Sequence, residues 1–194
     1  MKKMTDPSGV VYSEFIYMSE VVFILYNSNC VDLYLLTKSF SMANTYSQIY
    51  IQIVFAVKHR ESLIKSAWEE ELYKYMTGTV TKKGQKMLAI NGMPDHVHLL
   101  IGMRPSCCLS DLVREIKKSS NEFIKEKAFT RHRFQWQEGF GAFSYSHSSL
   151  DNIIRYIGNQ KEHHKNQSFK DEYKDFLIQF QIDHKDEYLF QWLE

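Results

Sequence analysis

Two histidines separated by one residue, His96 and His98, are the first candidates for chemistry in this chain. They lie in the segment DHVHLLIG, whose apolar residues favour a strand. Strand side chains alternate in direction, so both imidazoles project from one face with Cβ atoms roughly 6–7 Å apart, and together they can reach one metal ion. Two buried histidines held by ordinary hydrogen bonds are the alternative, because the His-x-His pattern is weak when it stands alone.

A tyrosine and a glutamine one helical turn apart form the second candidate pair. In the segment LDNIIRYIGNQKEHHK the apolar residues recur at helical spacing, at Leu150, Ile153, Ile154 and Ile157. This spacing predicts a helix from 150 to about 165. Residues four apart stack on one face, so Tyr156 and Gln160 form a polar line along the edge of the buried stripe. Tyr156 alone could equally be a core-edge residue with its hydroxyl in water.

Together these side chains define a route to phosphodiester cleavage. A divalent ion held by His96, His98 and an oxygen ligand such as Gln160 would polarise a scissile phosphate. A tyrosine hydroxyl is a weak nucleophile at neutral pH, so Tyr156 would need such help to attack the phosphorus. The covalent link preserves the energy of the phosphodiester bond, and rejoining the strand then needs no nucleotide cofactor.

Eight predicted elements position these residues. The patterns indicate strands at 46–57, 86–93 and 95–103 and helices at 66–83, 150–165 and 169–180. A further helix is expected to begin with Ser110 as its cap. An aromatic strand is expected within 134–147, with a bend at Gly139 and Gly141. The helix after Ser110 carries one apolar face of Leu112, Val113, Ile116, Phe123 and Ile124. Hairpins mixed with helices favour an α+β fold with a mostly antiparallel sheet.

Composition and charge are those of a globular, polyanion-binding protein. The 194 residues suffice for one domain with a real core, and 44% hydrophobic with 24% charged residues excludes wholesale disorder. Residues 42–165 hold eighteen Lys/Arg against twelve Asp/Glu, whereas residues 166–194 hold three Lys against seven Asp/Glu. A basic middle with an acidic tail suits a core that binds nucleic acid, although chance explains the charge pattern alone equally well.

The first 41 residues differ from the rest, because they show no clear strand or helix periodicity. The organised pattern begins at Met42, so we expect residues 42–194 to be the functional domain and residues 1–41 to be an extension outside the functional protein. The apolar run at 21–26 is too short to span a bilayer, and no signal-peptide cleavage pattern follows the N-terminal lysines.

The three cysteines, Cys30, Cys107 and Cys108, do not form a disulfide framework, because their number is odd and two of them are adjacent. The sequence contains no Cys-x-x-Cys pair, so we expect no structural zinc ribbon. This usage favours a cytoplasmic protein with reduced thiols and no membrane association.

The order of these motifs resembles the single-tyrosine HUH transposases of small bacterial insertion sequences. The resemblance covers about residues 44–165. It begins with TYSQIYIQIVFAVKHR, continues with the His96-Val97-His98 strand and LSDLVREIKKSSNEFIKEK, and ends with the helix of Tyr156 and Gln160. Each piece alone is unspecific, but the full set in this order is specific. The chain beyond His164 is similar only in general character.

The resemblance implies a ferredoxin-like sheet similar to RNA-recognition domains, with a mobile C-terminal tyrosine helix. It implies that His96, His98 and Gln160 bind Mg²⁺ or Mn²⁺, and that Tyr156 forms a 5′-phosphotyrosine on single-stranded DNA recognised through hairpins. It also implies a homodimer in which the tyrosine helix can serve the histidine pair of the other subunit.

The basic residues of the helix after Ser110 are candidates for DNA binding. Its polar face carries Arg114, Lys117, Lys118 and Lys125, and Lys58 and Arg60 follow the first strand of the predicted domain. Phosphate contacts from these side chains would bind DNA in a salt-dependent way. A solvated helix face is the alternative.

Three other functions share parts of this pattern. A replication or conjugation nickase of the same HUH class often carries a further metal-ligand histidine and extra domains. A domesticated or non-catalytic protein of this fold could bind hairpin DNA or RNA without cleaving it. A zinc hydrolase using His96 and His98 lacks a helix-borne His-x-x-x-His and a nearby general-base glutamate.

Overall fold

The computed structural model describes residues 3–5, 11–17, 20–25, 46–131, 133–185 and 189. The chain divides into two compact units, residues 1–45 and 46–194. The first has a three-stranded antiparallel sheet in the order β1 (Lys3–Thr5), β2 (Val11–Tyr17) and β3 (Glu20–Leu25). No element was expected from periodicity there. The strands form because β2 and β3 are rich in β-branched and aromatic residues, which favour strands even without strict alternation.

The second unit is built on a four-stranded sheet in which all pairs are antiparallel. Its strands are β4 (Ile49–Ala56), β5 (Lys86–Met93), β6 (His96–Met103) and β7 (Gly141–Tyr145), and their order across the sheet is β5-β6-β4-β7. Helix α1 (Glu69–Lys82) joins β4 to β5, and α2 (Leu109–Glu126) joins β6 to β7. This β-α-β-β-α-β order with the two central strands β4 and β6 is the ferredoxin-like fold, which confirms the predicted fold class.

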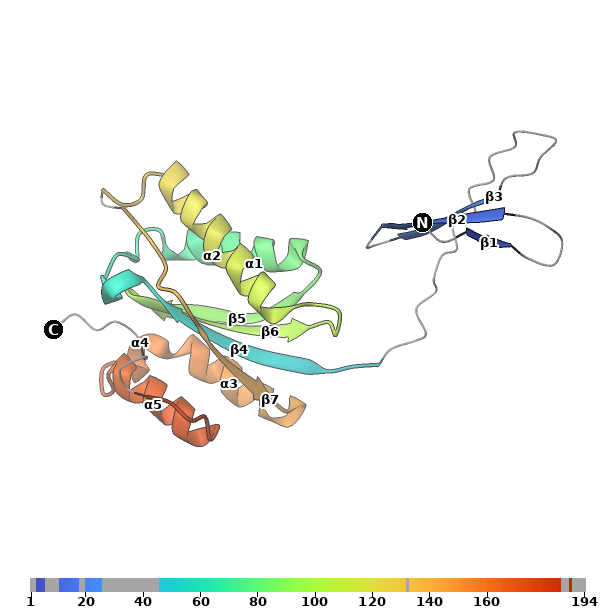
Figure 1. The fold of residues 1–194 in the computed structure, drawn as a ribbon. Coiled ribbons are helices and arrows are strands. Elements are labelled where there is room, and N and C mark those ends of the chain that lie inside the picture. Colours follow the sequence, from blue (N-terminus) through green and yellow to red (C-terminus); the bar gives the residue numbers. More distant parts are fainter. Residues whose placement is uncertain are drawn as a thin grey trace. The chain divides into compact units, whose positions relative to one another are not determined.

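Helices cover both faces of this sheet (Figure 1). The α1 and α2 helices lie on one face, and the C-terminal helices α3 (Leu150–Gly158), α4 (Gln160–His163) and α5 (Phe169–Gln179) lie on the other. The sheet is therefore the middle layer of three. Among the described residues no helix has both the length and the apolar character needed to cross a bilayer.

Strand β6 separates two hydrophobic clusters because its side chains alternate between the faces. Val97, Leu99 and Ile101 join the cluster under α1 and α2. The opposite face of the central strands, with Val54 and Ala56, packs against four buried residues of α5, Phe169, Tyr173, Phe176 and Leu177. His96 and His98 pair with Ala56 and Val54 across the sheet and so lie on this second face, as the alternation predicts.

Three local predictions are corrected. The helix expected at 150–165 is broken at Asn159 (φ −99°, ψ 18°), because Gly158 and Asn159 are both poor helix formers. Ser110 does not cap α2, which begins at Leu109 after Cys108. The aromatic segment 134–147 forms a strand only over Gly141–Tyr145, because Gly139 just before it adopts a left-handed φ of +78°.

Gly92 gives a direct test of how tightly β5 and β6 pack. An added Cβ would lie 2.2 Å from the backbone oxygen of His96 and 2.9 Å from Cα of Val97. We expect Gly92→Ala to lower the free energy of unfolding by roughly 2 kcal/mol, because the start of β6 must move. Urea denaturation measures the change. Gly78→Ala in α1, where nothing lies within 4 Å, should leave the protein equally stable or slightly more stable. Equal stability of both variants would contradict the packing described.

Candidate active site

The histidine pair of β6 is buried beneath the C-terminal helices. His96 and His98 are 1% and 0% exposed. Nδ1 of His96 lies 2.7 Å from Oδ1 of Asp95, and because a carboxylate only accepts, this nitrogen carries the hydrogen. Burial lowers the pKa of His96 to about 3. The ring is therefore neutral, with the lone pair of Nε2 directed away from Asp95.

A second line of hydrogen bonds supports His98. Nδ1 of His98 lies 3.0 Å from Nε2 of Gln52 on the neighbouring strand β4. The Tyr145 hydroxyl of β7 donates to Oε1 of Gln52 at 2.9 Å. Three adjacent strands thus fix the orientation of this ring, and its Nε2 faces the C-terminal helices.

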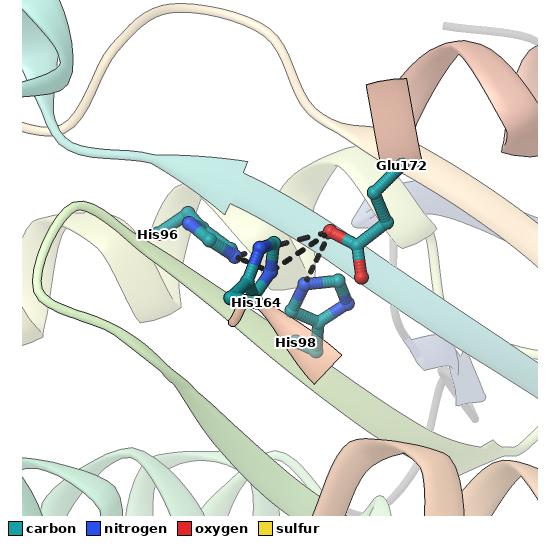
Figure 2. A group of neighbouring side chains, drawn as sticks. All are labelled: His96, His98, His164 and Glu172. Carbon is teal, nitrogen blue, oxygen red and sulfur yellow. Dashed lines mark hydrogen bonds and ion pairs between the residues drawn. The ribbon is translucent and has the colours of Figure 1, made fainter. Parts of the chain in front are cut away.

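The Glu172 side chain of α5 reaches toward the three imidazoles, and one of its carboxylate oxygens faces them (Figure 2). Its Oε2 is 3.4 Å from Nε2 of His98, 3.3 Å from Nε2 of His164 and 3.9 Å from Nε2 of His96. Burial alone would raise the pKa of this carboxyl, which is 3% exposed, but the neighbouring imidazoles of His164 and His98 hold the pKa well below its usual range. Glu172 is therefore a buried anion surrounded by imidazoles.

The other oxygen of Glu172 faces the candidate nucleophile. Tyr156 donates its hydroxyl hydrogen to Oε1 of Glu172, and Nε2 of Gln160 donates to the same atom at 3.1 Å. Burial and the charge of Glu172 raise the pKa of Tyr156 above its ordinary value. The structure thus brings Tyr156, Gln160 and both β6 histidines to one carboxylate, although the Gln160 amide presents its nitrogen there.

His164 completes the cluster from the turn after α4. Its Nδ1 lies 2.9 Å from the carbonyl oxygen of Gln167, and its Nε2 lies 3.1 Å from Nε2 of His96. Burial alone would lower the pKa of His164, but Glu172 raises it above the ordinary value. One ligand atom from each of His96, His98, His164 and Glu172 lies within 4.8 Å of the others.

Arg60, predicted to bind DNA, lies at the edge of this cluster. It follows β4 in the short η1 turn (Lys58–Arg60), where His59 and Arg60 both have positive φ. Its Nε donates to Oδ2 of Asp95 at 3.0 Å, and its guanidinium lies 4.0 Å from the ring centroid of Phe169. Burial alone would raise the pKa of Asp95, but the neighbouring His96 and Arg60 lower this pKa to about 2. Arg60 therefore connects the end of β4 to the start of α5.

The other predicted DNA contacts lie elsewhere. Arg114, Lys118 and Lys125 are exposed on α2, on the sheet face opposite the histidines, and Lys58 is exposed after β4. Lys117 is only half-exposed, because its ammonium donates to the carbonyl oxygens of Gln137 and Gly139. Burial lowers the pKa of Lys117 to about 8.

Sequence reasoning missed Glu172 and His164. Glu172 lies on the apolar stripe of α5, among Phe169, Tyr173, Phe176 and Leu177. A single carboxylate within an apolar helix face is the signal that could have found it, because a buried charge needs a partner. No functional role was predicted for the chain beyond His164. His164 carried no separate signal, since it is one of two adjacent histidines at a helix end.

Comparison with known proteins identifies the class to which this fold and site belong. The family model for IS200-like transposases matches residues 45–160, which is more than half of the chain. The chain therefore belongs to the IS200-like transposase family, and the resemblance found in the sequence is confirmed.

Individual relatives are distant in sequence. The ISDra2 transposase TnpA of Deinococcus radiodurans is 23% identical over 122 residues, which cover 59% of this chain and 86% of the relative. A crystal structure of a transposase from Deinococcus radiodurans R1 has a TM-score of 0.50 at 23% identity, covering 61% of this chain and 95% of that one. A REP-associated tyrosine transposase bound to a REP hairpin has a TM-score of 0.48 at 16% identity, covering 63% and 72% of the two chains.

The Arg60 contacts predict a stability effect. Removing one partner of a mostly buried ion pair leaves the other charge uncompensated, so Arg60→Ala should lower the free energy of unfolding by about 3 kcal/mol. The side chains of Arg60 and Asp95 are 12% and 18% exposed. Arg114→Ala is the control, because its pair with Asp111 is 73% and 59% exposed and should contribute little. Urea denaturation of both variants makes the comparison, and equal effects would contradict an anchoring role for Arg60.

Proposed function

We propose that this transposase cleaves and rejoins single-stranded DNA through a 5′-phosphotyrosine intermediate formed on Tyr156, with a divalent metal ion held at His96 and His98. The position of Tyr156 carries the proposal. Its hydroxyl and the two β6 histidines lie against the same buried carboxylate, Glu172. One helix-borne tyrosine beside a strand-borne histidine pair provides both the nucleophile and a place for positive charge.

In the proposed reaction the Tyr156 oxygen attacks the phosphorus of the scissile phosphodiester. A phosphorus–oxygen bond to Tyr156 forms and the bond to the 3′-oxygen breaks, so the 3′-hydroxyl leaves with the proton that the tyrosine gives up. Oε1 of Glu172 accepts the hydrogen bond of this hydroxyl and so orients it before attack. Attack by another 3′-hydroxyl reverses the step and rejoins the strand.

The residues present fit a divalent ion. His96 is neutral, Glu172 is charged, and among the described residues neither Nε2 of His98 nor Oε2 of Glu172 makes a hydrogen bond. Buried polar atoms without such partners are rare in proteins and call for an explanation, for which a bound ion is one candidate. When bound, the ion supplies positive charge at the scissile phosphate, an effect worth several kcal/mol.

DNA recognition is proposed to use hairpins and the basic face of α2. A groove beside α2 is lined by basic and polar side chains of the helix, Arg114, Lys117, Lys118 and Asn121, and by residues 135–140. The resemblance to single-tyrosine transposases supports hairpin substrates and a homodimer with shared active sites. In the single chain described, Tyr156 already lies beside the chain's own histidines, so a shared site would require α3 to exchange between subunits.

The nucleophile is tested by Tyr156→Phe, which removes only the hydroxyl. We expect this variant to bind hairpin DNA but to form no covalent adduct with a single-stranded oligonucleotide in the presence of Mg²⁺ or Mn²⁺. Electrophoresis under native conditions measures hairpin binding, and denaturing electrophoresis with mass spectrometry of the wild-type adduct measures covalent attachment. Tyr75→Phe is a matched control, because Tyr75 lies on α1, on the sheet face opposite the histidines. An adduct that persists in Tyr156→Phe and maps to another tyrosine would end the assignment.

Mixing variants tests the shared site separately. His96→Ala protein should also fail to cleave alone. If active sites are assembled across a dimer, mixing it with Tyr156→Phe protein should restore part of the activity. Failure of the mixture, with both variants folded, removes the shared-site claim and leaves the nucleophile assignment intact.

The α2 surface is tested by the salt dependence of binding. The triple variant Arg114→Ala, Lys118→Ala and Lys125→Ala should bind hairpin DNA more weakly, because each phosphate that is no longer neutralised reduces counterion release. The slope of log Kd against log salt should shrink by about one for each such phosphate. Lys74→Ala on α1, 74% exposed, should leave the slope unchanged. A triple variant with the wild-type slope would exclude these side chains as phosphate ligands.

A further inference from the structure

Four buried donor atoms from three separate elements converge on one point. His96 and His98 come from β6, His164 from the turn after α4, and Glu172 from α5 (Figure 2). The side chains of the four residues are 1%, 0%, 5% and 3% exposed. The histidine pair alone would leave most ligand positions of an ion open, whereas these two additional groups face the same point as the pair.

The hydrogen bonds on the far side of two rings leave a lone pair on each inward-facing nitrogen. Nδ1 of His96 donates a hydrogen bond to the Asp95 carboxylate, and Nδ1 of His164 donates one to the carbonyl oxygen of Gln167. When both rings are neutral, both Nε2 atoms are acceptors, and they lie only 3.1 Å apart. This contact is favourable only with a positive charge between the two atoms, which is either a proton on one of them or a cation bound by both. Metal-binding histidines commonly have this arrangement, with the other ring nitrogen bound to a carboxylate or a carbonyl.

Three of the distances between donor atoms are close to those around a single ion. Nitrogen and oxygen ligands about 2.1 Å from a tetrahedral ion lie about 3.4 Å from one another. The measured separations from Oε2 of Glu172 are 3.3 Å to His164 and 3.4 Å to His98, and the two Nε2 atoms of His96 and His164 are 3.1 Å apart. The separation between His96 and Glu172 is longer, at 3.9 Å, and all four donor atoms lie within 4.8 Å of one another.

We propose that Glu172 and His164 are ligands of the same divalent ion as His96 and His98. The inference rests on the proposed function only for the presence of an ion at the histidine pair. It assigns to Glu172 the ligand position that was expected for Gln160, whose amide instead holds the other carboxylate oxygen. Three imidazoles and one carboxylate favour a transition metal such as Co²⁺ or Zn²⁺ over Mg²⁺, which prefers oxygen ligands and retains its water.

Glu172 then links the ion site to the nucleophile. Its Oε2 faces the imidazoles while its Oε1 accepts from Tyr156 and Gln160. Because α5 is anchored by buried aromatic residues in the second hydrophobic cluster, the carboxylate is held in place rather than supplied by a free tail. The C-terminal helix is therefore part of the metal site in this proposal.

Direct metal binding tests the proposal without any cleavage assay. Metal-free full-length protein is titrated with Co²⁺, Zn²⁺ and Mg²⁺ by calorimetry, and the visible absorption of bound Co²⁺ reports its coordination. Glu172→Gln removes the charge but keeps the shape of the side chain. It should weaken Co²⁺ binding at least about tenfold and change the Co²⁺ spectrum. Glu162→Gln makes the same change on the neighbouring helix α4, where Glu162 pairs with Lys165 at the surface, and should bind Co²⁺ like the wild type.

A second variant separates ligation from a merely structural role. His164→Asn should also weaken Co²⁺ binding, and in both variants the rise in Tm that Co²⁺ causes in the wild type should shrink. Circular dichroism of the metal-free proteins shows whether each is folded. If Glu172 only pairs with a protonated His164, folded variants will bind Co²⁺ with wild-type affinity and spectrum, and the proposal is overturned. Wild-type protein that binds Mg²⁺ as tightly as Zn²⁺ would overturn the choice of ion.

The two proposals fail independently. A wild-type protein that forms no DNA adduct but loses Co²⁺ affinity in Glu172→Gln rejects the proposed function and keeps the ligand assignment. A protein that forms the adduct on Tyr156 but binds Co²⁺ equally well with and without Glu172 keeps the function and rejects the ligand assignment.

Discussion

The need to stabilise one buried carboxylate determines the packing of much of the C-terminal half of this protein. Glu172 is charged and 3% exposed, and an isolated charge in such a place would cost far more than a small domain can offset. Two β6 histidines, His164 and the donors Tyr156 and Gln160 surround it. The strand, the α3 helix and the tail helix therefore have to meet at one point, and the site and the packing of this layer depend on the same interaction.

The sheet makes this meeting possible because its central strands are buried on both faces. In many sheets of this fold two helices cover one face and the other is open to ligands. Here α3, α4 and α5 cover the second face, and aromatic side chains of α5 pack on Val54 and Ala56 beside the histidines. Burial penalises the charged forms of His96 and Tyr156 and moves both pKa values away from their ordinary values, whereas the imidazoles around Glu172 outweigh its burial and lower its pKa.

Local patterns predicted the parts of this structure that depend on near neighbours. Alternation placed His96 and His98 on one strand face, and helical spacing found the buried stripe of α2, because both periods are set by the backbone. The break at Asn159 was missed because a weak helix former does not by itself reveal where a helix stops. Glu172 was missed because its contacts reach residues that are distant in the chain. Only the folded layer brings these residues together.

The family match and the hydrophobic core end at different places. Similarity to IS200-like transposases stops at residue 160, whereas the packing of the second sheet face continues through α5 to Leu177. A fragment that ends at residue 160 would lose the α5 side chains that cover Val54, Ala56 and Phe143, and it would lose the Glu172 carboxylate that faces the two β6 histidines. Such a fragment would be prone to aggregate, so recombinant work on this protein should set domain boundaries by the three-layer fold.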